Sequence, residues 1–309
     1  MKTSEFAYLN FPFDEFNKPQ SEAIQFADKD CNLIVALNTS TGKTAVALCF
    51  FAHEIAKQLD TKCIYASPLK AISEERFEEL NRFSEWNHIP KIINTSDYMA
   101  DADDFMVARM IIVTSETLDS KSRNEKIHGE WIKKAGVLVI DEMHLLDEPK
   151  RGAALEAGLI NFTRINKDAR IVGLSATMSN ATEIASWLKS LNGKPTYCVS
   201  SNWRPVKLNK KWVGVPKGQD KWQSEQNMMD AAIDIVLKNR EDKLLLFVHS
   251  KRIGKNIVEA LQSYDVKAAF YHSGLTPDER KILGEQFKNR LYSLNVLVTT
   301  SALAQGVNL

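Results

Sequence analysis

Short runs of consecutive apolar residues recur along the first two thirds of the chain, separated by longer stretches with apolar residues at helical spacing. Runs without polar alternation are typical of strands that are buried on both faces of a parallel sheet. We expect strands at residues 33–37, 63–66, 110–113, 137–140 and 171–174. The intervening pattern predicts helices at residues 44–59, 69–86, 152–166 and 181–191. This alternation predicts an open α/β sheet that binds its ligands at the carboxyl ends of the strands.

The pattern changes after Val199. Residues 200–220 are rich in Lys, Pro and Trp and have no long apolar period, which predicts a linker with an edge strand around residues 206–213. Beyond it we expect helices at residues 225–239, 252–263 and 277–288, and strands at residues 244–248, 266–270 and 296–299. We therefore predict two α/β domains, residues 1–200 and 201–309, of which the second lacks its final strands and is incomplete.

The charge balance limits the ligands that the chain can attract. Its 40 Lys and Arg residues and 39 Asp and Glu residues give a net charge of +1, so a nucleic-acid ligand would need a local basic groove. The four cysteines are scattered, and we predict that all are buried in a reducing compartment. The first residues lack the apolar stretch of a signal peptide, and the longest apolar run, residues 45–52, is too short to span a bilayer. We expect a cytoplasmic, intracellular protein without a membrane partner.

A loop of small polar residues joins the first predicted strand to the following helix. It consists of Asn38, Thr39, Ser40, Thr41, Gly42, Lys43 and Thr44. In this setting the backbone N–H groups and the helix dipole would face phosphates, Lys43 would bind the β- and γ-phosphates, and the Thr44 hydroxyl would ligate Mg²⁺. The strict phosphate-loop pattern has Gly where Leu37 stands. The loop predicts a binding site for ATP and Mg²⁺.

Two acidic residues follow the strand predicted at residues 137–140. Asp141 would hold Mg²⁺, and Glu142 would orient and deprotonate an attacking water. An isolated Asp-Glu pair is more often a solvated strand end, but the phosphate loop on a neighbouring strand favours the catalytic interpretation. The next strand ends at Ser175 and Thr177, whose hydroxyls would bond to the two carboxylates and report the state of the γ-phosphate, or else serve as turn and cap residues.

These three motifs, in this order, resemble the DExH-box helicases of superfamily 2, with His144 as the last residue of the DExH motif. Further motifs of that family have counterparts in this sequence. They lie at residues 19–20, 66–72, 113–116, 247–251, 271–275 and 297–308. Residues 182–185 and Trp203-Arg204-Pro205 resemble the Ski-two-like group, and the likeness is greatest to its archaeal DNA-repair branch.

The resemblance implies two RecA-like domains, with ATP in the cleft between them and a single nucleic-acid strand across the top. It implies a catalytic role for His144 beside Lys43, Asp141 and Glu142, adenine recognition by Gln20, and ATP contacts from Gly306 and Asn308. It also implies strand contacts from Pro68, Leu69, Lys70, Thr114, Ser115, His249, Ser250, His272, Thr299 and Thr300. Main-chain N–H groups and hydroxyls at strand ends bind the phosphates of a strand and therefore give little sequence preference. Each hydroxyl taken alone is equally consistent with a helix cap or a turn. The archaeal branch moves 3′ to 5′ on DNA, whereas sister branches act on RNA.

The family also has an arginine-rich motif VI, which has no counterpart before Leu309. From this we expect slow ATP turnover and little unwinding by the chain alone, and a separate polypeptide that supplies motif VI is one way to complete it. A nucleotide-gated nucleic-acid-binding module without unwinding activity, and an RNA helicase of the same group, are the alternatives to a DNA helicase. A metabolite kinase would share the phosphate loop but would not explain the second α/β domain.

Overall fold

The computed structural model describes residues 1–5, 9–149, 151–289 and 294–300. The chain forms two compact units, Met1–Leu208 and Asn209–Leu309, and each is described by itself. The first unit extends past residue 200, where the change in sequence pattern placed the domain boundary.

A seven-stranded sheet, with every pair of neighbouring strands parallel, forms the centre of the first unit. Its strands lie in the order β3-β4-β2-β5-β6-β1-β7. They are β1 (Asn32–Leu37), β2 (Lys62–Ser67), β3 (Lys91–Asn94), β4 (Met110–Thr114), β5 (Ala135–Ile140), β6 (Arg170–Ser175) and β7 (Thr196–Ser201). The five central strands are the five that the apolar runs predict. The two edge strands, β3 and β7, are absent from that prediction.

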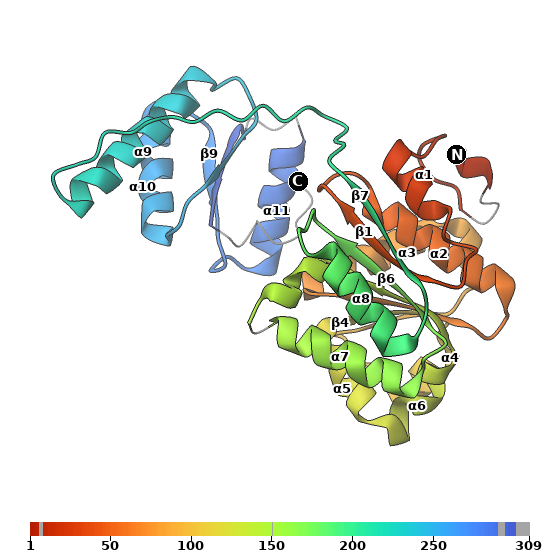
Figure 1. Cartoon of the computed structure of the whole chain (residues 1–309). Coiled ribbons are helices and arrows are strands. Elements are labelled where there is room, and N and C mark those ends of the chain that lie inside the picture. Colours follow the sequence, from red (N-terminus) through yellow and green to blue (C-terminus); the bar gives the residue numbers. More distant parts are fainter. Residues whose placement is uncertain (6–8, 150, 290–293, 301–309) are drawn as a thin grey trace. The chain divides into compact units, whose positions relative to one another are not determined.

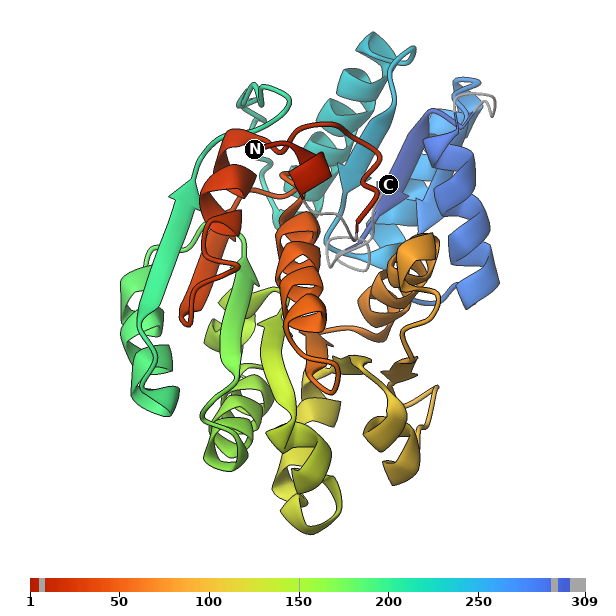
Figure 2. The ribbon, with the colours of Figure 1, turned by 90° about the vertical axis from the view of Figure 1, so that its right-hand side faces the viewer.

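Helices cover both faces of this sheet (Figure 1, Figure 2). One face carries α1 (Lys18–Ile24), α2 (Lys43–Lys57) and α3 (Lys70–Arg82). The other carries α4 (Ala102–Val107), α5 (Ser115–Arg123), α6 (Glu125–Lys133), α7 (Arg151–Ile165) and α8 (Ala181–Asn192). Successive strand residues point to opposite faces, so Val35 packs on the α2 side and Ile34 on the α7 side, and both are buried. The helix predicted at residues 69–86 ends at Arg82, and a separate 3₁₀ turn, η2 (Ser84–Trp86), follows it. Two more 3₁₀ turns, η1 (Thr3–Glu5) and η3 (Met143–Asp147), complete the first unit.

Strand register brings the candidate residues of the first unit to one edge of the sheet. Ala66 pairs with Ile140, Ser67 with Thr114, and Ala36 with Ser175. Because neighbouring strands run parallel and end at matching positions, the phosphate loop, the acidic pair and the residues after β2, β4 and β6 all follow the carboxyl edge.

The second unit contains three parallel strands in the order β8-β10-β9. They are β8 (Leu244–Phe247), β9 (Ala268–Tyr271) and β10 (Val296–Thr299). Helices α9 (Lys221–Lys238) and α10 (Lys251–Ser263) pack on one face through Ile233, Ile257 and their neighbours. Helix α11 (Pro277–Lys288) packs around Tyr271 and Leu297, which lie in a separate apolar cluster.

Two expectations about the chain are wrong. Residues 206–213 form no strand: Val206 and Trp212 are 78% and 96% exposed, because lysines interrupt the segment and leave it without a buried face. Cys198 is exposed, unlike Cys31, Cys49 and Cys63, because it lies on the edge strand β7. Within the described residues, no helix is long and apolar enough to cross a membrane.

Candidate nucleotide and nucleic-acid site

The phosphate loop is held in shape by hydrogen bonds from outside it. Asn17, the N-cap of α1, donates its side-chain amide to the carbonyl of Thr41 at 3.0 Å. The Thr41 hydroxyl donates to the carbonyl of Asn38 at 2.7 Å. At its start the loop is tied to residues that follow β7, because Arg204 Nη2 donates to Asn38 Oδ1 at 2.9 Å and Asn38 Nδ2 donates to the carbonyl of Trp203 at 3.3 Å. Thr39 and Ser40 lie exposed at its tip.

Gly42 occupies the position where the loop turns into α2. Its φ of +74° lies in the left-handed region, which favours glycine, and a Cβ built there would lie 2.4 Å from Nε2 of Gln20. Gln20 donates Nε2 to the carbonyl of Gly42 at 3.0 Å and accepts from the Asn17 N–H at 2.9 Å. The side chain predicted to read adenine is therefore buried here and braces the loop.

Lys43 and Thr44 begin α2, and both side chains are half-buried. The Lys43 ammonium donates to the carbonyls of Leu37 and Asn38, at 3.1 and 3.4 Å. Burial lowers the pKa of Lys43, and the nearby carboxylates of Glu142 and Asp141 oppose that shift. The loop follows β1 and the acidic pair follows β5, and only β6 lies between these two strands, so the loop and the acidic pair lie close together at the same edge of the sheet.

The acidic pair directly follows β5 at the same edge. Asp141 is buried, and its carboxylate accepts from the Tyr65 hydroxyl at 2.7 Å and from the Glu142 N–H at 2.9 Å. Glu142 has a φ of +50°, an uncommon value for a residue with a side chain, which is often found at functional positions. Burial raises the pKa of Glu142, and the negative charge of Asp141 adds to the rise. Both effects make this carboxylate more basic, as a general base requires.

His144 and the hydroxyls after β6 make fewer contacts than the sequence suggests. His144 Nδ1 lies 3.3 Å from Glu142 Oε2. The geometry is not that of a hydrogen bond, and among the described residues this nitrogen has no hydrogen-bond partner. The hydroxyl of Ser175 is buried and, among the described residues, has no hydrogen-bond partner. The expected bond from Ser175 to Asp141 or Glu142 is therefore not made in this structure, although Ser175 lies at the predicted edge. Thr177, two residues further along the chain, is exposed.

The strand-contact candidates of the first unit follow β2 and β4. Pro68 is buried and Leu69 is half-buried. Lys70, the first residue of α3, is exposed and forms an ion pair of 2.7 Å with Asp97. Thr114 caps α5 by accepting from the Thr117 N–H at 3.2 Å, and the Ser115 hydroxyl donates to the carbonyl of Ser67 at 3.4 Å. The capping role that the sequence left open is thus present for Thr114, whereas the Ser115 hydroxyl bonds to the end of β2.

In the second unit the candidates follow the carboxyl ends of three adjacent strands. Thr299 pairs with Phe247 and Tyr271, so β8, β9 and β10 end together. His249 is exposed, Ser250 caps α10 by accepting from the Ile253 N–H at 3.3 Å, and His272 Nδ1 accepts from the Gly274 N–H at 3.0 Å. Burial and nearby lysines lower the pKa of His272 and favour its neutral form. Thr299 is buried, and its hydroxyl donates to the carbonyl of Thr300. Gly306 and Asn308 lie outside the described residues.

Sequence reasoning missed two side chains that support this edge, Tyr65 and Asn17, and it did not predict the contact of Arg204 with the loop. Asn17 had a readable signal, because Asn followed three residues later by Gln is a capping-box pattern, and the structure forms that box. A Tyr within an otherwise apolar buried strand signals that its hydroxyl has a polar partner, but not which one.

Comparison with known proteins agrees with this arrangement. Residues 17–184 match the DEAD/DEAH box helicase family, and residues 227–309 match the helicase conserved C-terminal domain. The ATP-dependent DNA helicase Hel308 of Methanococcus vannielii is 31% identical, over 96% of this chain and 45% of its own length. That of Pyrococcus abyssi is 32% identical, over 96% of this chain and 44% of its own. The chain thus spans about half the length of these curated relatives.

Among solved structures, the DUF1998 helicase MrfA bound to DNA and AMPPNP superposes with a TM-score of 0.74 at 21% identity. The match covers 96% of this chain and 43% of that protein. At this level of identity the likeness establishes the fold, which is that of RecA-like helicases. From the family matches and the motifs at the carboxyl edge, we conclude that the chain belongs to the DEAD/DEAH box helicase family.

Proposed function

We propose that this chain is the ATP-hydrolysing core of a helicase that moves along single-stranded DNA. The observation that carries the proposal is the convergence of the phosphate loop after β1 and the Asp141-Glu142 pair after β5 at the carboxyl edge of one sheet, in which β6 pairs with both strands. If Lys43 and the acidic pair had only a structural role, the ammonium would be expected to form an ion pair with a carboxylate. It bonds instead to two carbonyls at the start of its own loop.

The residues at this edge fit Mg²⁺ and a nucleotide triphosphate. Mg²⁺ is commonly held by one or two carboxylates together with water and phosphate oxygens. Asp141 and the Thr44 hydroxyl would hold it, and it would supply charge neutralisation for the phosphates. In the described ranges no group of three or more His, Cys, Asp or Glu side chains forms a metal cage, which suits this mode of binding. The buried, unpaired hydroxyl of Ser175 is a further group that a ligand would satisfy.

Each remaining residue has a proposed task that its position supports. Lys43 binds the β- and γ-phosphates from the first turn of α2, where the helix dipole adds positive potential. Glu142 holds the attacking water and accepts its proton, and His144 lies beside that carboxylate to restrain it. Gln20 keeps Gly42 in the left-handed conformation on which the loop depends.

The strand contacts belong to the same proposal. Pro68 to Lys70, at the start of α3, and Thr114 and Ser115 would follow the phosphates of a single strand along the first unit. His249, Ser250, His272, Thr299 and Thr300 would do so along the second. These groups are main-chain N–H groups, hydroxyls and imidazoles, so the binding should have little sequence preference.

The test of ATP hydrolysis compares the wild-type chain with Glu142→Gln, which keeps the shape of the side chain and removes the base. Phosphate release should require Mg²⁺ and rise with added single strands. The variant should bind nucleotide normally and hydrolyse it about 10²–10⁴-fold more slowly. Equal rates in both proteins would refute the assignment of Glu142, and failure of the wild type to bind ATP would refute the proposed function.

The nucleic acid and the direction of movement need separate measurements. Matched DNA and RNA oligonucleotides should compete for the chain with DNA as the better ligand, in keeping with the DNA helicases that it resembles. Movement 3′ to 5′ predicts ATP-dependent displacement of streptavidin from a 5′-biotinylated strand but not from a 3′-biotinylated one. Preferential binding of RNA would favour an RNA helicase instead.

A further inference from the structure

Tyr65 lies in the middle of β2, with a side chain that is only 2% exposed. It points to the face of the sheet that α1, α2 and α3 cover, among apolar residues such as Val139 and Leu80. Its hydroxyl donates to Asp141 Oδ2 at 2.7 Å. A tyrosine whose ring alone was needed here could be replaced by Phe, so the hydroxyl has a purpose in this otherwise apolar layer.

The hydrogen bond from Tyr65 restrains the carboxylate of Asp141, the proposed Mg²⁺ ligand. Asp141 Oδ1 accepts from the Glu142 N–H at 2.9 Å, so each of its two oxygens is held by a different donor. Two donors on opposite oxygens leave the carboxyl group little freedom to rotate about its Cβ–Cγ bond.

Helix α3 contributes the positive charge that accompanies this buried pair. Arg76 lines a small hollow together with Thr44, Tyr65 and Glu79, and its guanidinium bonds to Glu79. The Arg76 charge acts on both Tyr65 and Asp141. The hollow therefore brings Thr44, Tyr65 and Arg76 of α3 together around one point.

We propose that Tyr65 is a positioning residue, whose hydroxyl fixes the carboxylate of Asp141 in the orientation that binds Mg²⁺. This inference rests on the proposed function, because it assumes that Asp141 holds the Mg²⁺ that accompanies ATP. It assigns no chemical step to Tyr65 itself. The expected effect of losing the hydroxyl is weaker Mg²⁺ binding with unchanged contacts to the nucleotide.

The test uses Tyr65→Phe, which removes one oxygen atom and keeps the ring. Binding of a fluorescent ADP analogue is measured in EDTA and then with increasing Mg²⁺. Loss of a group that orients a metal ligand typically costs about 10–100-fold in metal affinity. We expect the Mg²⁺ concentration for half-maximal effect to rise about tenfold, while affinity for the analogue in EDTA stays at the wild-type value.

Thr163→Val is the matched control. Thr163 is also buried, and its hydroxyl donates to the carbonyl of Leu159 at 2.8 Å within α7, away from the carboxyl edge. Both variants should lower the thermal midpoint of unfolding, since each loses a buried hydroxyl bond. Only Tyr65→Phe should shift the Mg²⁺ midpoint, and excess Mg²⁺ should restore its ATPase rate.

The outcomes separate this inference from the proposed function. If the wild type binds the analogue with Mg²⁺ dependence and Tyr65→Phe shows the same midpoint, Tyr65 does not position Asp141. A rate that excess Mg²⁺ fails to restore would likewise overturn the inference, because it would indicate general damage to the site. If the wild type shows no Mg²⁺-dependent nucleotide binding, the proposed function fails and the inference falls with it.

Discussion

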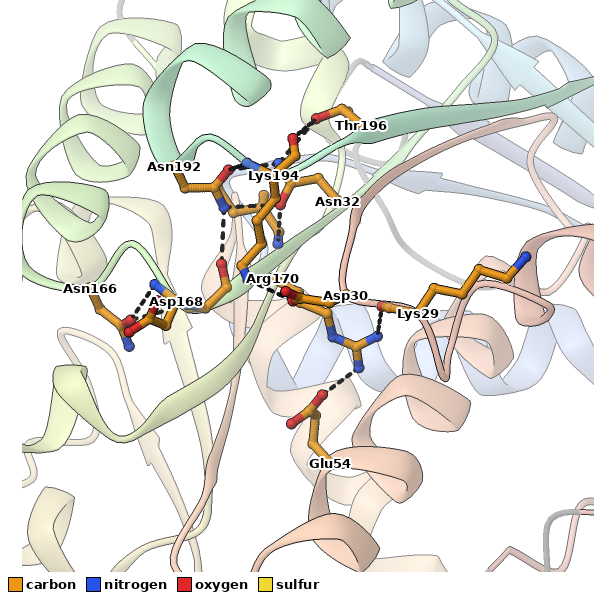
Figure 3. Close-up of polar contacts among 12 residues, drawn as sticks. Lys29, Asp30, Asn32, Glu54, Asn166, Asp168, Arg170, Asn192, Lys194 and Thr196 are labelled. Atoms are coloured by element: carbon orange, nitrogen blue, oxygen red, sulfur yellow. Dashed lines mark hydrogen bonds and ion pairs between the residues drawn. The ribbon is translucent and has the colours of Figure 1, made fainter.

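At the amino edge of the seven-stranded sheet, most buried polar side chains bond to one another and to the backbone, although Arg170 Nε has no partner among the described residues. At the carboxyl edge of the described structure, the Ser175 hydroxyl and His144 Nδ1 have none. Figure 3 shows the first case: the Arg170 guanidinium donates to the carbonyl of Lys29 at 2.8 Å and to Glu54 at 2.5 Å. It also donates to the carbonyl of Ala27 at 2.8 Å. Asn32 bonds to Asn192 in both directions, at 2.9 and 3.0 Å.

The difference shows at which edge a bound ligand could supply missing partners. A hollow of about 350 Å³ lies at the amino edge, and several of its charged lining residues are paired, with Arg170 on Glu54 and Lys134 on Asp60. At the carboxyl edge the positive φ values of Ser40 and Glu142 mark strained backbone positions, which lower the stability of the fold and are often found at functional sites. The contacts of the amino edge stabilise the fold, and the carboxyl edge is the one that we propose binds the ligand.

Breaking the buried ion pair should have the largest effect on stability. Arg170→Met leaves the Glu54 carboxylate buried without its cation, and we expect a loss of about 3–5 kcal/mol in the free energy of unfolding, measured with urea. Adding Glu54→Met should recover much of that loss, because it removes the unpaired charge. Additive losses in the double variant would show that the two side chains act independently.

Removal of the loop ammonium should have the opposite profile. Lys43→Ala is expected to lower the ATPase rate by about 10²–10³-fold, since a preorganised charge on the transferring phosphoryl group is lost. Its free energy of unfolding should stay equal or rise, because a partly buried ammonium with a lowered pKa is removed. A large loss of stability would contradict the proposal that Lys43 serves binding at this edge.

Lys62 provides a pH test of the amino edge. It lies at the start of β2, is 1% exposed, and donates to the carbonyls of Met106 and Ala108. Burial lowers its pKa to about 8, from 10.5 in the unfolded chain. Between these values the unfolded chain binds more protons than the folded one, so stability should rise with pH across this window.

The measurement compares wild type with Lys62→Met between pH 7.5 and 10.5. The wild type should gain about 2–3 kcal/mol relative to the variant over that range, at 1.4 kcal/mol for each unit of pKa shift. Other titrating groups contribute to both proteins and cancel in the difference. Parallel stability curves would mean that Lys62 keeps its ordinary pKa when buried.

The smallest effect is expected at the edge strand. The Thr196 hydroxyl accepts from Asn32 Nδ2 at 3.0 Å, and Thr196→Val would remove that bond while keeping the branched shape. We expect a loss of about 1 kcal/mol and an unchanged ATPase rate, because Asn32 still bonds to Asn192. Thr182→Val, at an exposed position on α8, is the control and should leave stability nearly unchanged.

The sequence predicted the five central strands because each is buried on both faces and so carries a continuous apolar run. It missed β3 and β7 because edge strands lack that pattern: most residues of β3 are half-buried, and those of β7 are mainly exposed. The position of Lys43 and Asp141 at one edge followed from topology alone. The Tyr65–Asp141 bond could not be predicted, since it joins residues on two strands whose register is set by the whole sheet.

The hydrogen bond between Arg204 and Asn38 couples the phosphate loop to the segment that follows β7. The backbone leaves the first unit soon after Arg204, so the exit of the chain is anchored on the nucleotide loop itself. Any rearrangement of the loop that displaces Asn38 must either pull on this anchor or release it. In both cases a movement of the phosphate loop would be transmitted through the backbone to the segment that leads to Asn209.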